Sequence, residues 1–331
     1  MTKLRIAILG DGGWGTTLAI LLSKKGYAVT LWGAFSAYTK TMVKTRYNPK
    51  FLPGIKIPRQ IEITNDIKSA VDDKEIIVLA VPSQYTRLTL RKISGCFAKK
   101  TIFLSVTKGI EIGSSKRMSE VIRAELGPVK LAVLSGPTIA SEVAKEVPTA
   151  AVAASADKRI RKTIQTIFST KRFRVYTNPD VIGVELGGSL KNVIAIACGV
   201  SDGLGFGTNT KAAILTRGIA EISRLGEAMG AKLETFSGIS GLGDLVTTCI
   251  SKQSRNRSVG ELIGKGKNLK EIYRNMQMVA EGVPTAKSAY ALSLKYNIEM
   301  PIIKEVYHLL YKNKSPRQAV NDLMTRKSKE E

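Results

Sequence analysis

The 331-residue sequence has only one histidine and three cysteines. Because His308 stands alone, metal sites and nucleophile–base pairs built on imidazole are nearly excluded, and acid–base chemistry falls to Lys, Asp, Glu or Tyr. The cysteines Cys96, Cys198 and Cys249 are odd in number and widely spaced, which suggests neither a disulfide framework nor a zinc site. We therefore expect no metal centre.

Long hydrophobic runs are also missing. The longest, Val193 to Val200, is too short to cross a membrane, so no membrane span is predicted. The N-terminus leads straight into an apolar strand, without the h-region and cleavage site of a signal peptide. These features predict a cytoplasmic protein.

Acidic residues are few: the sequence has 27 Asp and Glu and 51 Lys and Arg, which gives a formal net charge of +24. Such an excess would suit a nucleic-acid-binding protein. The basic residues are spread along the whole chain, however, with only short doublets such as Lys99-Lys100 and Lys171-Arg172. This spread favours general attraction of an anionic cofactor and substrate, and no nucleic-acid partner is predicted.

The order of expected elements divides the chain near residue 178. Before it, short apolar runs alternate with helical stretches, which is typical of a mostly parallel sheet covered by helices. The expected strands are Leu4–Leu9, Ala28–Trp32, Glu75–Val81, Thr101–Val106, Leu131–Ser135, Thr149–Ala154 and Phe173–Tyr176. Residues 48–58 are expected to form a long irregular loop. The later pattern is helical, so an α/β domain (1–178) and an all-α domain (179–331) are predicted.

A glycine motif lies between the first expected strand and an expected helix at Trp14–Lys25. Residues Gly10–Gly15 read GDGGWG, which has the GxGxxG form. In that pattern Gly10 allows a tight turn, Gly12 lets the backbone approach a pyrophosphate, and Gly15 allows close helix–strand packing. The helix that follows directs free N–H groups at phosphates. The motif in this context predicts a site for NAD or NADP.

The usual determinant of NAD against NADP is missing. In this fold an acid at the end of the second strand binds the adenine ribose 2′-OH of NAD, whereas an arginine accommodates the 2′-phosphate of NADP. The sequence has neither between Leu31 and Ser36. Lys40 or Arg46 in the following segment could reach a 2′-phosphate, so both cofactors stay open.

The second half contains a lysine in an apolar helix. The segment Gly187–Cys198 predicts a helix that is apolar nearly all round and therefore buried, yet Lys191 interrupts it. Its neighbours on the helix face are small, which predicts a cavity beside the ammonium that a ligand could fill. A buried lysine has a pKa that readily falls into the range useful for general acid–base work. The alternative is a lysine that extends its ammonium to water.

Two later segments supply polar groups. Asp244 follows the glycine-rich segment Ser237–Gly243 and is either the partner of Lys191 or a helix N-cap. Ser254–Asn256 concentrate hydrogen-bond donors suited to phosphate, with a polar turn as the alternative. Ser258–Glu261 fit a capping box, which places these donors near a helix N-terminus.

Two segments of the first half each end an expected strand. They are Thr107-Lys108-Gly109 and Ser135–Thr138. Since open α/β sheets bind ligands at the carboxyl ends of their strands, Lys108 and Thr138 are expected at the same crevice.

Together these segments resemble the bacterial NAD(P)-dependent glycerol-3-phosphate dehydrogenase family over essentially the whole chain. The resemblance rests on the order and spacing of Gly10–Gly15, Val81–Ser83, Thr107–Gly109, Ser135–Thr138, Leu190–Val193, Ser201–Gly203, Gly241–Leu245, Gln253–Arg257 and Val279–Gly282. It implies a Rossmann-type α/β domain followed by an all-α domain, as in the 6-phosphogluconate and hydroxyacid dehydrogenases.

The resemblance also implies residue roles. Lys191 corresponds to the general acid–base at the C2 oxygen of dihydroxyacetone phosphate. The implied substrate-binding residues are Lys108, Gly136, Thr138, Lys191, Asp244, Ser254, Arg255 and Asn256. The implied cofactor-binding residues are Gly10, Gly12, Gly13, Trp14, Gly15, Lys108, Ala140, Arg255, Val279 and Glu281. Family members often have a polar or basic residue where this sequence has Ala34.

The implied activity is the reversible reduction of dihydroxyacetone phosphate to glycerol 3-phosphate for glycerophospholipid synthesis, by a homodimer. The alternative is a related hydroxyacid or ketopantoate-type dehydrogenase of the same architecture, which a separate phosphate site at Ser254–Asn256 disfavours. A non-enzymatic dinucleotide sensor or nucleic-acid-associated protein is favoured only by the charge.

Overall fold

The computed structural model describes residues 4–276, 279–328 and 330, and it divides the chain into two compact units. The first unit comprises the chain up to Lys108 together with Lys116–Glu185. The second comprises Gly109–Ser115 and the chain from Leu186 onward. The domain boundary near residue 178 stays a prediction.

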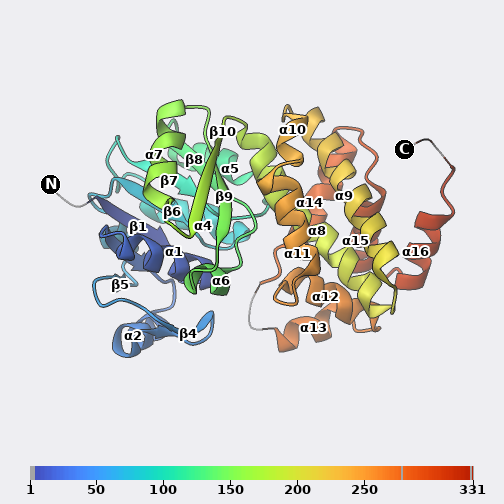
Figure 1. The fold of residues 1–331 in the computed structure, drawn as a ribbon, viewed down its shortest axis with the longest axis horizontal. Coiled ribbons are helices and arrows are strands. Elements are labelled where there is room, and N and C mark those ends of the chain that lie inside the picture. Colours follow the sequence, from blue (N-terminus) through green and yellow to red (C-terminus); the bar gives the residue numbers. More distant parts are fainter. Residues whose placement is uncertain (1–3, 277–278, 329, 331) are drawn as a thin grey trace. The chain divides into compact units, whose positions relative to one another are not determined.

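The first unit is built on a sheet of eight described strands (Figure 1). These are β1 (Arg5–Leu9), β2 (Ala28–Trp32), β5 (Glu62–Thr64), β6 (Ile76–Leu79), β7 (Ile102–Ser105), β8 (Lys130–Ser135), β9 (Thr149–Ala154) and β10 (Phe173–Asn178). Their spatial order is β10-β9-β8-β7-β6-β1-β2-β5, and only the pair β8–β9 is antiparallel. From β5 to β8 this is the doubly wound order 3-2-1-4-5-6, which changes direction between β1 and β6, where ligands bind in such sheets.

Helices cover both faces of the sheet, and the side chains of β1 show why. Ile6 and Ile8 enter one core while Ala7 and Leu9 enter the other, and all four are fully buried. The first core is covered by α1 (Gly13–Lys24), α2 (Ser36–Thr45), α6 (Ala140–Ala144) and α7 (Lys158–Phe168). The second is covered by α3 (Ile67–Val71), α4 (Thr86–Ile93) and α5 (Met118–Leu126), and the 3-10 turn η1 (Ser83–Tyr85) precedes α4. Because neither face meets water at the central strands β1, β6 and β7, these are largely apolar runs, whereas β5 and β10 at the two edges of the sheet are partly exposed.

The segment expected to be an irregular loop contains a two-stranded ribbon. β3 (Tyr47–Asn48) pairs antiparallel with β4 (Leu52–Lys56). Both strands of such a ribbon have a free edge, so Pro53 and Gly54 fit where a central strand would exclude them. The expectation of a loop over 48–58 is therefore wrong.

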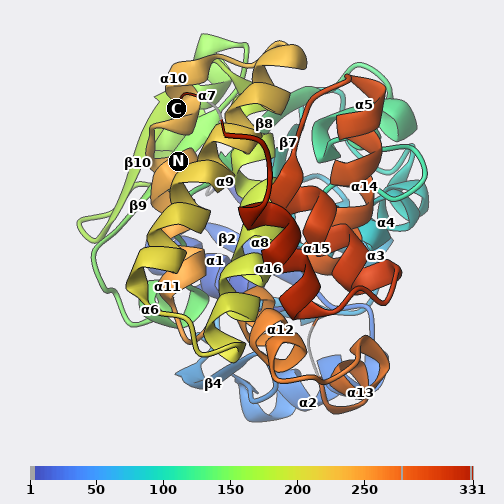
Figure 2. The same cartoon turned by 90° about the vertical axis from the view of Figure 1, so that its right-hand side faces the viewer.

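All described elements of the second unit are helical. They are α8 (Val181–Gly203), which begins in the first unit, α9 (Thr208–Ala228), α10 (Leu233–Phe236), the π-helical turn η2 (Ile239–Gly243), α11 (Asp244–Ile250), α12 (Arg255–Gly264), α13 (Leu269–Asn275), α14 (Gly282–Lys295), α15 (Pro301–Tyr311) and α16 (Pro316–Met324). In Figure 2, α14, α15 and α16 pack in sequence against one another. The predicted fold class, a mostly parallel α/β domain followed by an all-α domain, is confirmed.

Helix α8 is apolar around its whole circumference because it lies in a core. Leu186, Leu190, Val193 and Ile194 are fully buried. By length and composition alone this helix could cross a membrane. The sequence analysis predicts no membrane span, because it considers only uninterrupted apolar runs. However, 83% of its most apolar window is buried inside the protein, which is typical of a core helix.

The chain leaves the first unit within α8, at a buried ion pair. The Glu185 carboxylate accepts hydrogen bonds from Arg117 Nη1 at 2.6 Å and from the Ser119 main-chain N–H at 2.7 Å. Burial raises the pKa of Glu185 above its ordinary value, although the charge of Arg117 opposes the rise. The segment Gly109–Ser115 also belongs to the second unit, which the sequence does not predict. In this segment the Glu111 carbonyl accepts a hydrogen bond from the Ser288 hydroxyl at 3.1 Å.

Candidate active site

Three glycines shape the turn between β1 and α1. A Cβ atom at Gly10, where φ is +124°, would lie 2.7 Å from the main chain of Ala80, across the β1–β6 switch point. A Cβ at Gly15 would lie 2.0 Å from the Gly10 carbonyl oxygen. A Cβ at Gly12 would meet no described atom within 4 Å. Two glycines are therefore needed to close the turn, while the third leaves open space for a ligand.

The N-terminus of α1 suits an anion. Its N-cap residue Gly12 offers no side-chain cap, and its first turn has no acidic residue. No side chain of the helix's own first turn or N-cap therefore satisfies the first N–H groups at the positive end of the helix dipole. A dinucleotide pyrophosphate fits this combination of exposed N–H groups and space beside Gly12.

Further predicted cofactor residues lie around the same turn. A Cβ at Gly13 would lie 3.6 Å from the Ala140 Cβ, and the Thr17 hydroxyl donates to the Ala140 carbonyl at 3.1 Å. The Trp14 ring centroid lies 6.3 Å from that of Phe173. The structure thus brings Gly13 and Ala140 together and anchors Trp14 on the sheet.

Lys108 joins the ends of two neighbouring strands. Its Nζ donates to the Gly136 carbonyl at 2.7 Å and to the Thr138 hydroxyl at 3.4 Å. Lys108 follows β7, whereas the other two residues follow β8, its parallel neighbour. The three predicted residues therefore form one cluster at the carboxyl end of the sheet.

Arg46, the arginine between β2 and β4, is held by main-chain carbonyls. The Arg46 guanidinium donates to the main-chain carbonyls of Pro58 and Ile61 and so holds the β3–β4 ribbon. Lys40 and Ala34 are exposed. The suggestion that Arg46 reaches a 2′-phosphate is not supported by these contacts.

In the second unit Lys191 is buried and paired. The residue is only 5% exposed, and its ammonium forms an ion pair with the Asp244 carboxylate, which is 1% exposed. The Lys191 Nζ also donates to the Thr248 hydroxyl at 2.6 Å, which in turn donates to the Asp244 carbonyl at 2.7 Å. Of the two predicted roles for Asp244, partner of Lys191 or helix N-cap, the structure shows the first. The N-cap of α11 is Gly243, and the Asp244 carboxylate does not cap it.

Gly187, one of the small residues beside Lys191, allows another segment to approach helix α8 closely. A Cβ at Gly187 would lie 2.8 Å from the Ser240 carbonyl oxygen. The main chain of η2 thus fills the space beside Gly187, while the predicted cavity beside the ammonium stays a prediction. The close approach of η2 to α8 is what brings Asp244, the next residue, to Lys191.

The donor cluster Ser254–Asn256 occupies the start of α12. Ser254 is the N-cap, and its hydroxyl accepts a hydrogen bond from the Arg257 N–H at 3.3 Å. The predicted capping box at Ser258–Glu261 is wrong, because Ser258 lies inside the helix, where its hydroxyl donates to the Ser254 carbonyl at 3.0 Å. The helix begins one turn earlier than predicted, and the donors lie at its N-terminus itself.

Asn256 connects three helices next to the lysine. Its Nδ2 donates to the Asn192 Oδ1 at 2.9 Å, and its Oδ1 accepts from the Gly282 N–H at 2.8 Å. Because Asn192 directly follows Lys191, this bridge fixes the start of α12 relative to the lysine. Arg255 donates to the Val279 carbonyl at 2.7 Å, and Glu281 is the N-cap residue of α14.

Sequence reasoning missed two positions of this network. Thr248 lies four residues after Asp244 and therefore on the same face of α11, a spacing that could have identified it. Asp202 accepts from Arg257 Nε at 2.7 Å and pairs with Lys211 at 2.7 Å, a contact between three helices that no local pattern reveals. Over the described parts of the chain, no group of three or more His, Cys, Asp or Glu could hold a metal ion.

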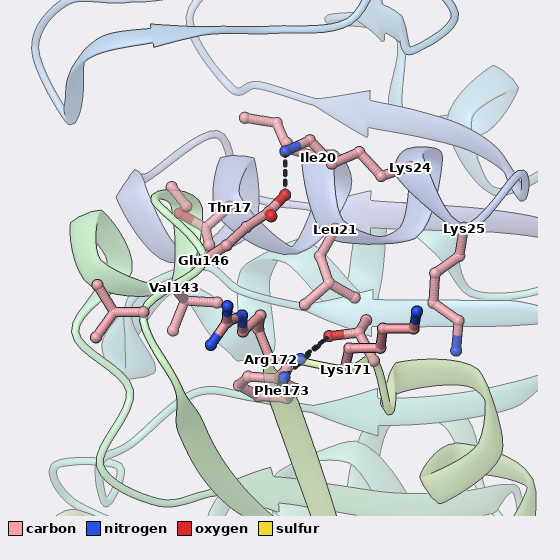
Figure 3. Close-up of a pocket in the computed structure, with 13 residues that line it drawn as sticks. Thr17, Ile20, Leu21, Lys24, Lys25, Val143, Glu146, Lys171, Arg172 and Phe173 are labelled. Carbon is pink, nitrogen blue, oxygen red and sulfur yellow. Dashed lines mark hydrogen bonds and ion pairs between the residues drawn. The ribbon is translucent and has the colours of Figure 1, made fainter.

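A cavity of about 270 Å³ in the first unit lies between α1, α6 and the start of β10 (Figure 3). Lys24 and Glu146 form an ion pair at 2.6 Å on one side, and Lys171 and Arg172 lie on the other. Lys25 Nζ donates to three carbonyls that follow or end α7. None of the predicted site residues lines this cavity, so it is separate from the candidate site.

Comparison with known proteins gives matches over both units. Residues 5–161 match the model of the NAD-dependent glycerol-3-phosphate dehydrogenase N-terminus, and residues 180–321 match that of the C-terminus of the same family.

Individual relatives align over nearly their whole length. Glycerol-3-phosphate dehydrogenase (NAD(P)+) of Prosthecochloris aestuarii is 51% identical over 98% of this chain and 99% of its own. The corresponding protein of Citrifermentans bemidjiense is 51% identical over 99% and 98%. The solved structure of glycerol-3-phosphate dehydrogenase from Coxiella burnetii matches with a TM-score of 0.95 and 41% identity, over 98% of this chain and 99% of that one.

Proposed function

The chain belongs to the NAD-dependent glycerol-3-phosphate dehydrogenase family, and from that premise we propose that it reduces dihydroxyacetone phosphate to glycerol 3-phosphate, reversibly, with NADH or NADPH. The observation that carries the proposal is the buried pair of Lys191 with Asp244 beside the donor cluster of α12. It combines a proton donor with a phosphate site, which a phosphorylated ketone requires.

Lys191 is the proposed general acid. When bound, the nicotinamide supplies or accepts the hydride at C2 of the substrate. During reduction the Lys191 ammonium stabilises the negative charge that develops on the C2 oxygen and donates its proton to that atom. In the reverse direction the neutral amine takes the proton back. Asp244 and Thr248 orient the ammonium.

The start of α12 is the proposed phosphate site. Ser254, Arg255 and Asn256 place a hydroxyl, a guanidinium and an amide at one helix N-terminus, where the helix dipole favours an anion. Asn256 is tied to the residue after Lys191, so phosphate binding here sets the position of the C2 oxygen relative to the proton donor. Asp244 completes this part of the substrate site by holding the lysine.

The first unit is the proposed cofactor-binding domain, and the second is the proposed substrate domain. The proposed cofactor residues are Gly10, Gly12, Gly13, Trp14, Gly15, Lys108, Ala140, Arg255, Val279 and Glu281, and the proposed further substrate residues are Lys108, Gly136 and Thr138. We also propose a cytoplasmic homodimer that binds no nucleic acid and supplies glycerol 3-phosphate for glycerophospholipid synthesis. The even spread of basic residues and the family premise support this.

A substrate panel tests the proposal. Oxidation of NADH and NADPH is followed by absorbance with dihydroxyacetone phosphate, with dihydroxyacetone and with 2-ketopantoate. We expect turnover with the first compound, and a kcat/KM at least about 10²-fold lower with the unphosphorylated ketone, because phosphate binding supplies the orientation. Faster turnover of 2-ketopantoate would instead identify the protein as a ketopantoate-type dehydrogenase. No oxidation of NADH or NADPH in any mixture would refute both activities.

A further inference from the structure

One oxygen of a buried carboxylate at the glycine turn lacks a hydrogen-bond donor among the described residues. Asp11, the second residue of the GDGGWG motif, is 9% exposed, and its Oδ2 accepts no hydrogen bond from any residue that the structure describes. Its main chain is firmly held, because Asn48 Nδ2 donates to the Asp11 carbonyl at 2.7 Å and the Thr16 hydroxyl donates to it at 3.3 Å. A buried polar atom without a partner is rare in proteins and often marks a binding site.

This carboxylate lies beside the end of β2. β1 and β2 pair in parallel with Leu9 opposite Trp32, so Asp11 and Gly33 follow neighbouring strand ends. A Cβ at Gly33 would lie 2.5 Å from the Asp11 Oδ2. The space that a side chain at position 33 would occupy therefore holds the carboxylate of Asp11, and glycine at position 33 is what allows it to be there.

The end of β2 is where dinucleotide-binding folds place their ribose-binding acid. The segment Leu31–Ser36 has no acid, but the structure supplies a carboxylate at that strand end from a different strand. We propose that Asp11 accepts the hydrogen bond of the adenine ribose 2′-OH and repels a 2′-phosphate, so that the enzyme prefers NAD(H) to NADP(H). This inference rests on the proposed function only in that the first unit binds a dinucleotide.

Neighbouring charges support this role. Burial raises the pKa of the Asp11 carboxyl above its ordinary value, whereas a main-chain hydrogen bond and the positive charge of Lys50 oppose the rise. The Arg46 guanidinium donates hydrogen bonds to the carbonyls of Pro58 and Ile61. It is therefore not placed to bind a 2′-phosphate and compensate for its repulsion by the Asp11 carboxylate. Lys50 is the cation whose charge acts on Asp11, and the experiment includes it.

Nucleotide binding without substrate tests the inference. The Kd values of NADH and NADPH are measured by fluorescence titration for the wild type, Asp11→Asn and Lys50→Ala. We expect the wild type to bind NADH at least about tenfold more tightly than NADPH, since a hydrogen bond to a charged group is worth about that factor. Asp11→Asn should weaken NADH and strengthen NADPH, bringing the two Kd values within about threefold. Lys50→Ala should leave the preference for NADH in place.

A matched control separates local from general charge effects. Asp72→Asn removes the same charge from an exposed position at the end of α3 and should keep the wild-type ratio of Kd values. Thermal melting without nucleotide should give Asp11→Asn a Tm close to that of the wild type, because asparagine keeps one acceptor oxygen for the local main-chain hydrogen bond and Oδ2 has no donor to lose.

The possible outcomes separate this inference from the proposed function. Equal binding of both nucleotides by the wild type, or an unchanged ratio in Asp11→Asn, overturns the role of Asp11 alone. Selective NADH binding without turnover of dihydroxyacetone phosphate supports the inference and contradicts the proposed function. Failure to bind either nucleotide overturns both.

Discussion

Replacing Asp244 by asparagine should leave the Lys191 ammonium buried without its counter-charge. The two residues are 1% and 5% exposed, so water does not screen the loss. Removing one partner of a buried ion pair typically costs 3–5 kcal/mol. Thr248 still accepts a hydrogen bond from Lys191 after the change. We therefore expect the lower end of that range, a fall of about 3 kcal/mol in the free energy of unfolding.

A double-mutant cycle measures this interaction directly. Free energies of unfolding are determined by urea denaturation for the wild type, Lys191→Met, Asp244→Asn and the double variant. Each single variant should lose about 3 kcal/mol, and the double variant less than the sum, with a coupling of at least about 2 kcal/mol. The exposed pair of Lys265 with Glu261, at 2.7 Å, is the matched control and should show a coupling of at most about 0.5 kcal/mol because solvent screens it. Additive losses at Lys191 and Asp244 would refute the reasoning.

Gly12→Ala should leave the thermal stability unchanged, because the new Cβ meets open space, yet weaken NADH binding at least about tenfold in a fluorescence titration; unchanged binding would contradict the pyrophosphate site. Gly15→Ala should instead lower the free energy of unfolding by at least about 2 kcal/mol, since its Cβ would lie 2.0 Å from the Gly10 carbonyl oxygen. Burial raises the pKa of Glu221 from 4.5 to about 7, so this group stabilises the fold fully below pH 4.5, and the stabilisation is lost as pH rises through 7. Glu221→Gln should accordingly lose about 3 kcal/mol less than the wild type between pH 4.5 and pH 8 in urea denaturation, and equal losses would show that Glu221 does not titrate in this range.

The sequence reveals the central strands of the first unit because they are buried on both faces, whereas the short edge strand β5, which is only partly buried, is not among the expected strands. Runs such as those of β2 and β9 stand out as continuous apolar segments, and their expected bounds agree with the structure. The β3–β4 ribbon escapes this reasoning, because one proline and one glycine in a short edge strand look like a loop. Local composition identifies strands that are buried on both faces. It fails at edge strands, because an edge strand tolerates proline and glycine.

Some residues of the candidate site can likewise be identified from the sequence, and others cannot. Lys191 can be found from sequence because a charge in an apolar helix is conspicuous, and Asp244 because it follows a glycine-rich segment. The start of α12 is misplaced by one turn, since both Ser254 and Ser258 can cap a helix and only the packed structure decides. Asp11 escapes entirely, because its meaning depends on the register of β1 against β2 and on the missing side chain at Gly33.

The most direct test of the proposed function is turnover of dihydroxyacetone phosphate by the wild type and by Lys191→Ala. NADH oxidation is followed by absorbance, and NADH binding by fluorescence in the same samples. We predict that the variant loses at least about 10² in kcat while its Kd for NADH stays within threefold of the wild type, because Lys191 acts as the proton donor and does not hold the cofactor. Near-normal turnover by Lys191→Ala, or no turnover by the wild type with either cofactor, would contradict the account.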